Sequence, residues 1–170
     1  MDYTPGIFKL KNYTPVADRT LHSTLTKQLA LYITLYSPLQ MAADLPENYE
    51  ARSDAFQFIR DVPVDWDDTR IIEAEPGDYV TIARKQKSKQ DWFIGAITDE
   101  NSRESVIPLD FLEKNKKYQA TIYKDAPNTD WKNNPEAYII EKIEVDASSV
   151  LKIRLAPGGG CAVSIKVKSK

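Results

Sequence analysis

The chain has 170 residues, of which 42% are hydrophobic and 28% charged, and 23 basic against 25 acidic side chains give a net charge of −2. These values are ordinary for a globular protein, and the balanced charge favours neither nucleic acid nor an anionic membrane surface as a partner. Cys161 is the only cysteine, which excludes an internal disulfide and a multi-cysteine metal site, and its apolar surroundings predict a small buried residue.

The N-terminal part of the chain contains a long and unusually apolar helix. Residues 1–20 hold two proline turns and lack a basic start followed by an apolar run, so they predict a loop and no signal peptide. Apolar residues then recur at three- and four-residue steps, which predicts a buried helix over Leu21–Ser37. Thr20 or Ser23 is its expected cap, and Pro38 cannot continue it.

A short apolar segment follows this helix. Pro38–Ala43 is predicted as a buried parallel strand, and Leu29–Ala43 is too short and too interrupted to cross a bilayer. A helix followed closely by such a strand is half of an α/β unit, and the sequence contains no other. The chain is therefore expected to begin inside a larger domain. A second, shorter helix is predicted over Asp54–Val62, with Asp54 as its cap.

From Pro63 onward the pattern is that of an antiparallel β-sandwich. Short β-rich runs recur roughly every 10 to 15 residues, separated by turn residues, and several alternate apolar with polar side chains. The predicted strands are Thr69–Ala74, Asp78–Lys85, Trp92–Thr98, Glu104–Leu109, Lys117–Asp125, Ala137–Val145, Val150–Leu155 and Cys161–Val167. The sequence thus divides into residues 1–62 and a sandwich of about eight strands over residues 63–170.

The residues that carry chemistry do not complete an active site. His22 is the only histidine and is expected to be a polar surface or interface residue. The four aspartates between residues 61 and 68 lack the glycine and glutamate of a calcium loop, so they predict a solvated turn. Asp99–Ser102 is expected to be a hairpin loop, with a sugar or metal contact as the alternative.

The three tryptophans leave two alternatives open. Trp92 heads an apolar strand and is expected in the core. Trp66 and Trp131 are either packed side chains or a stacking platform for a sugar ring. Nothing in their spacing decides between the two.

Long stretches of the chain resemble the C-terminal end of glycoside hydrolase family 97, a family of bacterial α-glucosidases and α-galactosidases that act in saccharide utilisation. The resemblance covers essentially the whole chain. It is carried by MDYTPGIF at 1–8, HSTLTKQLALYITLYSPLQMAADLPENY at 22–49, DAFQFIRDVPVDWDDT at 54–69, PGDYVTIARK at 76–85, DWFIGAITDENSR at 91–103, IPLDFLEKNKKYQATIYKDA at 107–126 and NPEAYIIEK at 134–142.

The resemblance implies that residues 1–62 are the end of a (β/α)₈ barrel, followed by a C-terminal β-sandwich with Greek-key-like connections. It places the catalytic carboxylates and the calcium ligands upstream, so this chain is expected to have no catalytic residue and no metal or cofactor of its own. Asp2, Tyr3 and Asp44 are the residues implied to lie near substrate in a full-length protein, since barrel enzymes build their sites at the carboxyl ends of the strands. The full-length family is periplasmic.

The function expected from the sequence is that of a non-catalytic C-terminal portion whose sandwich braces the catalytic barrel. An α-linked oligosaccharide would then be a partner only through the missing barrel, and no nucleic acid or membrane is expected. The alternatives are a free-standing carbohydrate-binding or protein-interaction module, and an enzyme assembled with a separately encoded barrel fragment. The apolar helix predicts a homodimer joined through Leu21–Tyr36.

Overall fold

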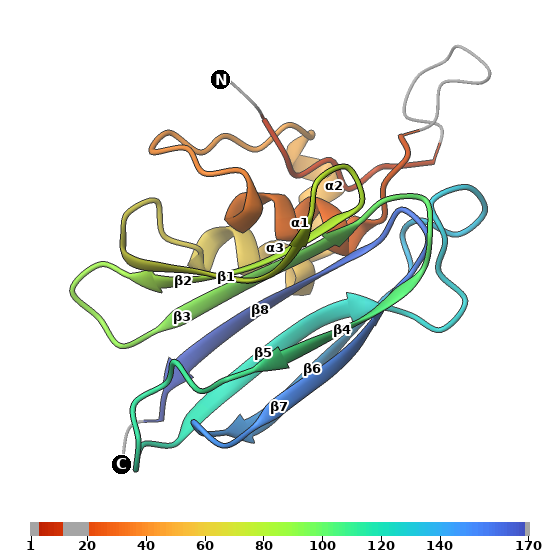
Figure 1. Ribbon diagram of the computed structural model, residues 1–170. Coiled ribbons are helices and arrows are strands. Elements are labelled where there is room, and N and C mark those ends of the chain that lie inside the picture. The colour runs from red at the N-terminus through yellow and green to blue at the C-terminus, as the bar shows by residue number, and fades with distance from the viewer. Residues whose placement is uncertain (1–3, 12–20, 169–170) are drawn as a thin grey trace.

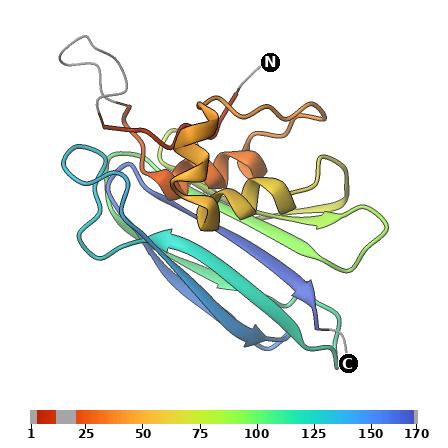
Figure 2. The ribbon, with the colours of Figure 1, turned by 180° about the vertical axis from the view of Figure 1, so that it is seen from behind.

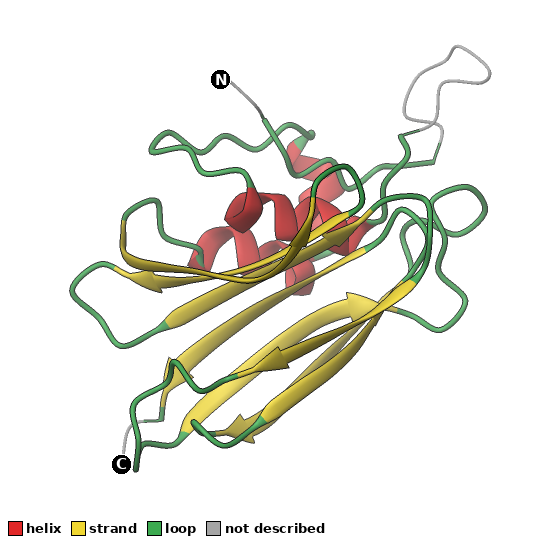
Figure 3. Cartoon of the chain, in the orientation of Figure 1, coloured by secondary structure: helices red, strands yellow, loops and turns green. Residues whose placement is uncertain are grey.

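The computed structural model describes residues 4–11 and 21–168. In these residues, helices gather on one side of a β-sandwich (Figure 1; Figure 3). The helices are α1 (Leu25–Thr34), α2 (Pro46–Glu50) and α3 (Ser53–Asp61). The strands are β1 (Trp66–Glu75), β2 (Tyr79–Gln86), β3 (Trp92–Thr98), β4 (Arg103–Pro108), β5 (Tyr118–Asp125), β6 (Tyr138–Val145), β7 (Val150–Leu155) and β8 (Gly160–Val167).

The strands form two sheets. Six of them pair in the order β1-β2-β3-β8-β5-β6, and β4 pairs with β7 in a second sheet. Every pairing is antiparallel, and the chain crosses from one sheet to the other between β3 and β4, β4 and β5, β6 and β7, and β7 and β8. The predicted mainly β, antiparallel sandwich of about eight strands is therefore confirmed.

The central strands β3 and β8 are buried on both faces. Side chains alternate across a strand, so Trp92 and Ile94 enter the core between the two sheets while Phe93 points to the helices. The view from behind shows α1 and α3 lying across the outer face of the six-stranded sheet (Figure 2). This explains why β3 and β8 read as nearly continuous apolar runs, whereas β7, buried on one face, alternates.

Two glycines allow α1 to lie directly on this sheet. A Cβ atom on Gly95 of β3 would lie 2.6 Å from the carbonyl oxygen of Ala30 and 2.8 Å from Cβ of Ile33. A Cβ atom on Gly160 of β8 would lie 2.7 Å from Cα of Lys27. Real Cβ atoms do not approach other heavy atoms so closely, so the helix and the sheet touch backbone to backbone.

Helix α1 is shorter than the sequence predicted. It begins at Leu25 and its cap is Thr24, whose hydroxyl accepts a hydrogen bond from the N–H of Lys27, so Ser23 is not the cap and Thr20 lies outside the described residues. The N–H groups of Thr24 and Leu25 donate to the carbonyl oxygens of Gly158 and Pro135. These long-range bonds hold the preceding residues out of the helix, which ends at Thr34 instead of Ser37.

The predicted strand Pro38–Ala43 is wrong. These residues form an irregular, largely exposed loop, and among the described residues no strand lies beside them. A strand needs a neighbour to accept and donate its backbone hydrogen bonds. Hydrogen bonds to neighbouring segments hold the loop: the Tyr32 hydroxyl donates to the carbonyl oxygen of Met41, the Gln40 side-chain amide donates to that of Tyr32, and the N–H of Ala43 donates to that of Pro5.

The remaining helices differ in smaller ways. Helix α2 was not predicted; Pro46 occupies its first turn, where the missing N–H costs nothing. Helix α3 begins at Ser53, one residue before the predicted start, and its N-cap position is Arg52, so Asp54 is not the cap. The Asp54 carboxylate instead accepts hydrogen bonds from the N–H of Ala55 and the hydroxyl of Tyr138 on β6.

The bounds of the strands agree closely with those predicted from the sequence. The bounds of β3 and β7 are those predicted, and the largest difference is at β1, which begins three residues before Thr69. Cys161 is fully buried in the sandwich core, as its surroundings predicted, and this burial raises the pKa of its thiol far above the usual value. Trp92 is also a core residue.

Candidate functional site

Of the three residues implied to lie near substrate, Asp2 and Tyr3 lie outside the described residues. Asp44 ends the loop that precedes α2, and its carboxylate binds four donors. Oδ2 accepts hydrogen bonds from the N–H groups of Phe8 (2.7 Å) and Lys9 (2.8 Å). Oδ1 accepts from the N–H of Leu45 (2.8 Å) and the side-chain amide of Asn48 (2.6 Å). Asp44 thus ties the N-terminal segment to α2.

These donors decide the charge state of Asp44. Burial alone would raise the pKa of this carboxyl, but the hydrogen bonds from Lys9, Asn48, Leu45 and Phe8 outweigh it and lower the pKa. The carboxylate borders a hollow of about 390 Å³ whose other lining residues are Pro46, Tyr49, Glu50, Ser53, Phe56 and Arg60. Proximity of Asp44 to substrate stays a prediction, and its present contacts are structural.

We expect the Asp44→Asn variant to lose about 1 kcal/mol of unfolding free energy at neutral pH, because it loses charge-assisted bonds at a partly exposed position. The folded pKa lies below the usual value of 3.8, so this contribution is present above pH 3.8 and is lost as the pH falls through the folded pKa. Urea unfolding across pH 2–7 measures it. The gap between variant and parent should close in acid; a constant gap would contradict the assignment. Glu50→Gln, in the same hollow, is the control.

The aspartates between residues 61 and 68 do not converge on a metal. Asp61 pairs with Lys166, Asp65 with Lys87 and Asp68 with Arg70, while Asp67 accepts a hydrogen bond from a loop N–H. Within the described residues there is no group of three or more His, Cys, Asp or Glu side chains that could hold a metal ion. The arrangement of these aspartates therefore does not fit a calcium site. The calcium ligands implied by the family resemblance lie upstream.

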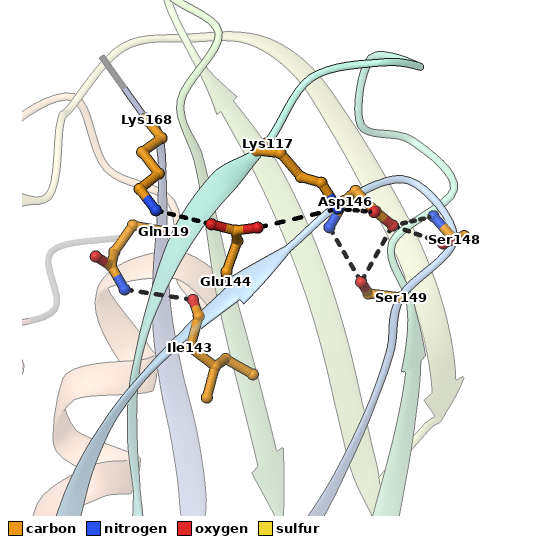
Figure 4. A network of polar contacts seen from close by, with 8 residues as sticks. All are labelled: Lys117, Gln119, Ile143, Glu144, Asp146, Ser148, Ser149 and Lys168. Carbon is orange, nitrogen blue, oxygen red and sulfur yellow. Dashed lines mark hydrogen bonds and ion pairs between the residues drawn. The ribbon is translucent and has the colours of Figure 1, made fainter. Parts of the chain in front are cut away.

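A second cluster of charged side chains lies at the end of the sandwich where β5 begins and β6 and β8 end. Lys117 pairs with Asp146 (2.7 Å) and Lys168 with Glu144 (2.7 Å), joining β5, β6 and the end of β8, while Asp146 also accepts bonds from Ser148 (Figure 4). The lysines and acids satisfy one another and the network is exposed to solvent. Such surface pairs contribute little stability, and this network offers no unpaired group for a ligand.

Several large apolar side chains are exposed to solvent in the loop of residues 35–45, which we call the apolar loop. Leu39 is 71% exposed and Tyr36 51% exposed, and three more of its large apolar side chains also face solvent: Leu35, Met41 and Leu45. In contrast, Leu29 and Ile33 of α1 are completely buried. The face of α1 that was expected to join two copies is therefore covered by the chain's own sheet, and the exposed apolar surface lies beyond the helix end.

The comparisons with known proteins agree with this architecture. Residues 65–166 match a family model described as "Glycosyl-hydrolase 97 C-terminal, oligomerisation". The chain belongs to glycoside hydrolase family 97. It is 34% identical over 98% of its length to a retaining α-galactosidase of Bacteroides thetaiotaomicron, of which it covers 25%. It is 32% identical over 64% of its length to a probable retaining α-galactosidase of Streptomyces bingchenggensis, of which it covers 16%.

Solved family 97 structures match more closely still. The chain is 48% identical, with a TM-score of 0.94, to a family 97 enzyme of Pseudoalteromonas sp. strain K8 that was solved in complexes with panose and with acarbose. The match covers 99% of this family 97 chain and 26% of the enzyme. This chain thus spans about a quarter of the Bacteroides and Pseudoalteromonas relatives, and it carries the C-terminal domain of the family. In the described residues, no helix is long and apolar enough to cross a membrane.

Sequence reasoning missed how residues from separate segments of this family 97 chain come together. His22 is exposed, as predicted, but its ring lies 4.0 Å from that of Trp131, tilted by 37°. Both side chains border the same cavity as Asp99 and Glu100. Each of these residues was singled out in the sequence for its chemistry, but no local pattern indicated that they meet.

Proposed function

We propose that this chain is the non-catalytic C-terminal portion of a family 97 α-glycosidase, and that its sandwich braces the catalytic barrel. The observation that carries the proposal is the apolar loop, which exposes five large apolar side chains in a chain that covers only about a quarter of its Bacteroides and Pseudoalteromonas relatives. Each leucine that becomes fully buried contributes about 1.5–3 kcal/mol. Contact with a barrel would bury this loop.

The junction between helices and sandwich is suited to a brace. Besides the close approach at Gly95 and Gly160, two ion pairs cross it: Arg52 with Glu136 and Lys166 with Asp61, each at 2.7 Å. The Glu136 carboxylate also accepts hydrogen bonds from two N–H groups of the N-terminal segment. A body attached to the helices would therefore be held rigidly to the sheet, without a flexible linker.

A chimera tests the brace. We expect the Pseudoalteromonas enzyme, with its C-terminal quarter replaced by this chain, to keep its hydrolytic activity and to melt in one transition. Leu39→Asp in the chimera should lower Tm by several degrees, because about 1–3 kcal/mol of apolar burial is lost and a charge is buried in its place. The matched control is Ile71→Asp on β1, which is equally exposed at 69%. Two independent melting transitions, insensitive to Leu39→Asp, would refute the brace.

On the same proposal, glycoside cleavage takes place in the barrel, which this chain does not contain. Glycoside cleavage needs two opposed carboxyl groups, and we infer that these, together with the calcium ligands, lie in the barrel, which binds an α-linked oligosaccharide in the periplasm during saccharide utilisation. This chain alone should then release no product from aryl α-glucosides or α-galactosides, with or without calcium. Calcium-dependent turnover by the purified chain would contradict the assignment.

We also propose that the isolated chain forms a homodimer, because exposed apolar patches promote association when their natural cover is absent. The oligomerisation named in the family description supports this. The predicted interface, Leu21–Tyr36, contributes only its exposed end, Leu35 and Tyr36, joined by the rest of the apolar loop.

Light scattering coupled to size exclusion tests the dimer. We expect a dimer that Leu39→Asp converts to a monomer and that Ile71→Asp leaves intact, since both residues are similarly exposed but only Leu39 lies in the apolar loop. Circular dichroism should show the strand content unchanged in both variants. A parent chain that is monomeric at high concentration, or a dimer broken only by Ile71→Asp, would contradict this interface.

A further inference from the structure

Five segments of the chain, most of them distant in the sequence, border a cavity of about 190 Å³ at one end of the sandwich. It is lined by His22, Lys27, Asp99, Glu100, Trp131 and Gly158, and we call it the Trp131 cavity. They come from the segment before α1, the first turn of α1, the loop after β3, and the loops that precede β6 and β8. A larger hollow of about 460 Å³ adjoins it, and Lys27 and Asp99 line both.

Backbone hydrogen bonds fix the walls of the Trp131 cavity. The N–H of Gly158 donates to the carbonyl oxygen of Asp99 (2.7 Å), and the N–H of Trp131 donates to that of Pro157 (3.1 Å). The ammonium of Lys27 donates to the carbonyl oxygen of Thr98 (2.6 Å), so it is held beside Asp99. The cavity is therefore formed in advance and does not depend on a ligand to order it.

The polar groups of this cavity are presented in fixed positions. The Asp99 carboxylate accepts hydrogen bonds from the N–H (2.9 Å) and the side-chain amide (2.8 Å) of Asn101, which lower its pKa and keep it ionised. Glu100 makes no side-chain hydrogen bond within the described part of the chain, so both of its oxygens are available. Lys27 keeps two of its three N–H donors after its bond to Thr98.

The charges around the cavity select the class of ligand. Two carboxylates oppose an anion, while the Lys27 ammonium opposes a divalent cation. A neutral ligand whose hydroxyl groups both donate and accept hydrogen bonds satisfies both kinds of group. The rings of His22 and Trp131 add an aromatic wall, against which the C–H face of a sugar ring packs well. The volume of about 190 Å³ is below the roughly 300–1,000 Å³ of pockets for drug-sized ligands, which limits the ligand to a single ring.

We propose that the Trp131 cavity is a binding subsite for one neutral hexopyranose unit, separate from any catalytic centre. Glu100 and Asp99 accept hydrogen bonds from its hydroxyl groups, Lys27 donates to them, and the His22–Trp131 pair contacts its apolar face. The site is built from this chain's own residues and goes beyond the bracing role. Its test on the isolated chain therefore stays informative even if the chimera experiment fails, and the reverse also holds.

The indole N–H resonances give a direct readout, because the chain has three tryptophans in three environments. Titrating the ¹⁵N-labelled chain with glucose, galactose or maltose should shift the Trp131 indole signal saturably, while the Trp92 signal from the core and the Trp66 signal stay in place. At about 100 mM sugar, a site with a Kd of about 10 mM is about nine-tenths occupied. A Trp131 signal that does not move there, or three signals that move together, overturns the proposal.

Two matched variants locate the site. Glu100→Gln removes the charge that accepts from sugar hydroxyls and should weaken binding about tenfold, the equivalent of one charge-assisted hydrogen bond. Glu104→Gln, on the exposed face of β4, should leave the affinity unchanged. His22→Ala should weaken binding by removing part of the aromatic wall without disturbing the core. Equal affinities in the parent, Glu100→Gln and His22→Ala proteins would overturn this assignment of the cavity.

Discussion

Replacing Gly95 by alanine is expected to remove about 3 kcal/mol or more of the free energy of unfolding. The added methyl group would lie 2.6 Å from the carbonyl oxygen of Ala30 and 2.8 Å from Cβ of Ile33, and neither atom is the end of a flexible side chain. Either α1 must move off the sheet, or β3 must shift away from its pairing with Ile82 and Ala162. Overpacked cores typically lose about 1–3 kcal/mol, and occasionally more.

The comparison that isolates this close approach is Gly77→Ala, in the turn between β1 and β2. There the added methyl group meets nothing within 4 Å, and the only cost is a φ of +94°, which side chains other than glycine rarely adopt. Such strain costs about 1–3 kcal/mol. Urea unfolding followed by far-ultraviolet circular dichroism should therefore find Gly95→Ala the more destabilised of the two. The reverse order would show that the helix does not rest on this strand as described.

The extent of the sandwich was predictable because the residues that separate its strands form short, local turn signals. A proline–glycine turn separates β1 from β2, a polar hairpin loop separates β2 from β3, and the glycines before β8 mark its start. Each signal acts over a few residues and does not depend on distant contacts. The bounds of β3 and β7 were therefore predicted correctly.

The helical segment was less predictable because distant residues decide it. Helix α1 starts at Leu25 because Gly158 and Pro135, more than a hundred residues away, bind the N–H groups at its start. Pro38–Ala43 has the composition of a buried strand, but composition cannot supply the neighbour that a strand needs. These residues are part of the exposed apolar loop, and the structure places no strand of the described residues beside them.

The candidate sugar site illustrates the same limit. Trp131 and the Asp99–Ser102 loop were each recognised as possible sugar contacts, and His22 as a possible interface residue. Whether such residues meet depends on how β3, α1 and the loop before β6 are placed, which no local pattern encodes. The cavity follows from the tertiary fold alone.

Asp125 is a buried acidic residue that joins α1 to the sandwich. It lies at the end of β5, where Oδ2 accepts hydrogen bonds from the N–H groups of Ala156 (2.9 Å) and Gly160 (3.1 Å). The Thr26 hydroxyl of α1 donates to Oδ1. Burial raises the pKa of this carboxyl, and the hydrogen bonds from threonine hydroxyls and backbone N–H groups oppose that effect without cancelling it.

We expect Asp125→Ala to cost about 3 kcal/mol or more, because three buried donors lose their acceptor and each costs about 1–3 kcal/mol when left unsatisfied. Asp125→Asn keeps an acceptor oxygen and should cost much less. Asp110→Ala, at an exposed position after β4, should stay within about 0.5 kcal/mol of the parent. Similar losses for Asp125→Ala and Asp125→Asn would show that the charge itself, and not the acceptor oxygens, holds this junction.

The pH dependence of the same pair tests the charge state of Asp125. Since its folded pKa lies above the usual value of 3.8, the native protein binds this proton more tightly than the unfolded chain. The parent should therefore be most stable relative to Asp125→Asn below pH 3.8, and should lose that advantage as the pH rises through the folded pKa. Urea unfolding of both proteins at closely spaced pH values measures the difference. A parent that gains stability over Asp125→Asn as the pH rises would mean that the hydrogen bonds outweigh burial, and that the carboxylate is the form the junction prefers.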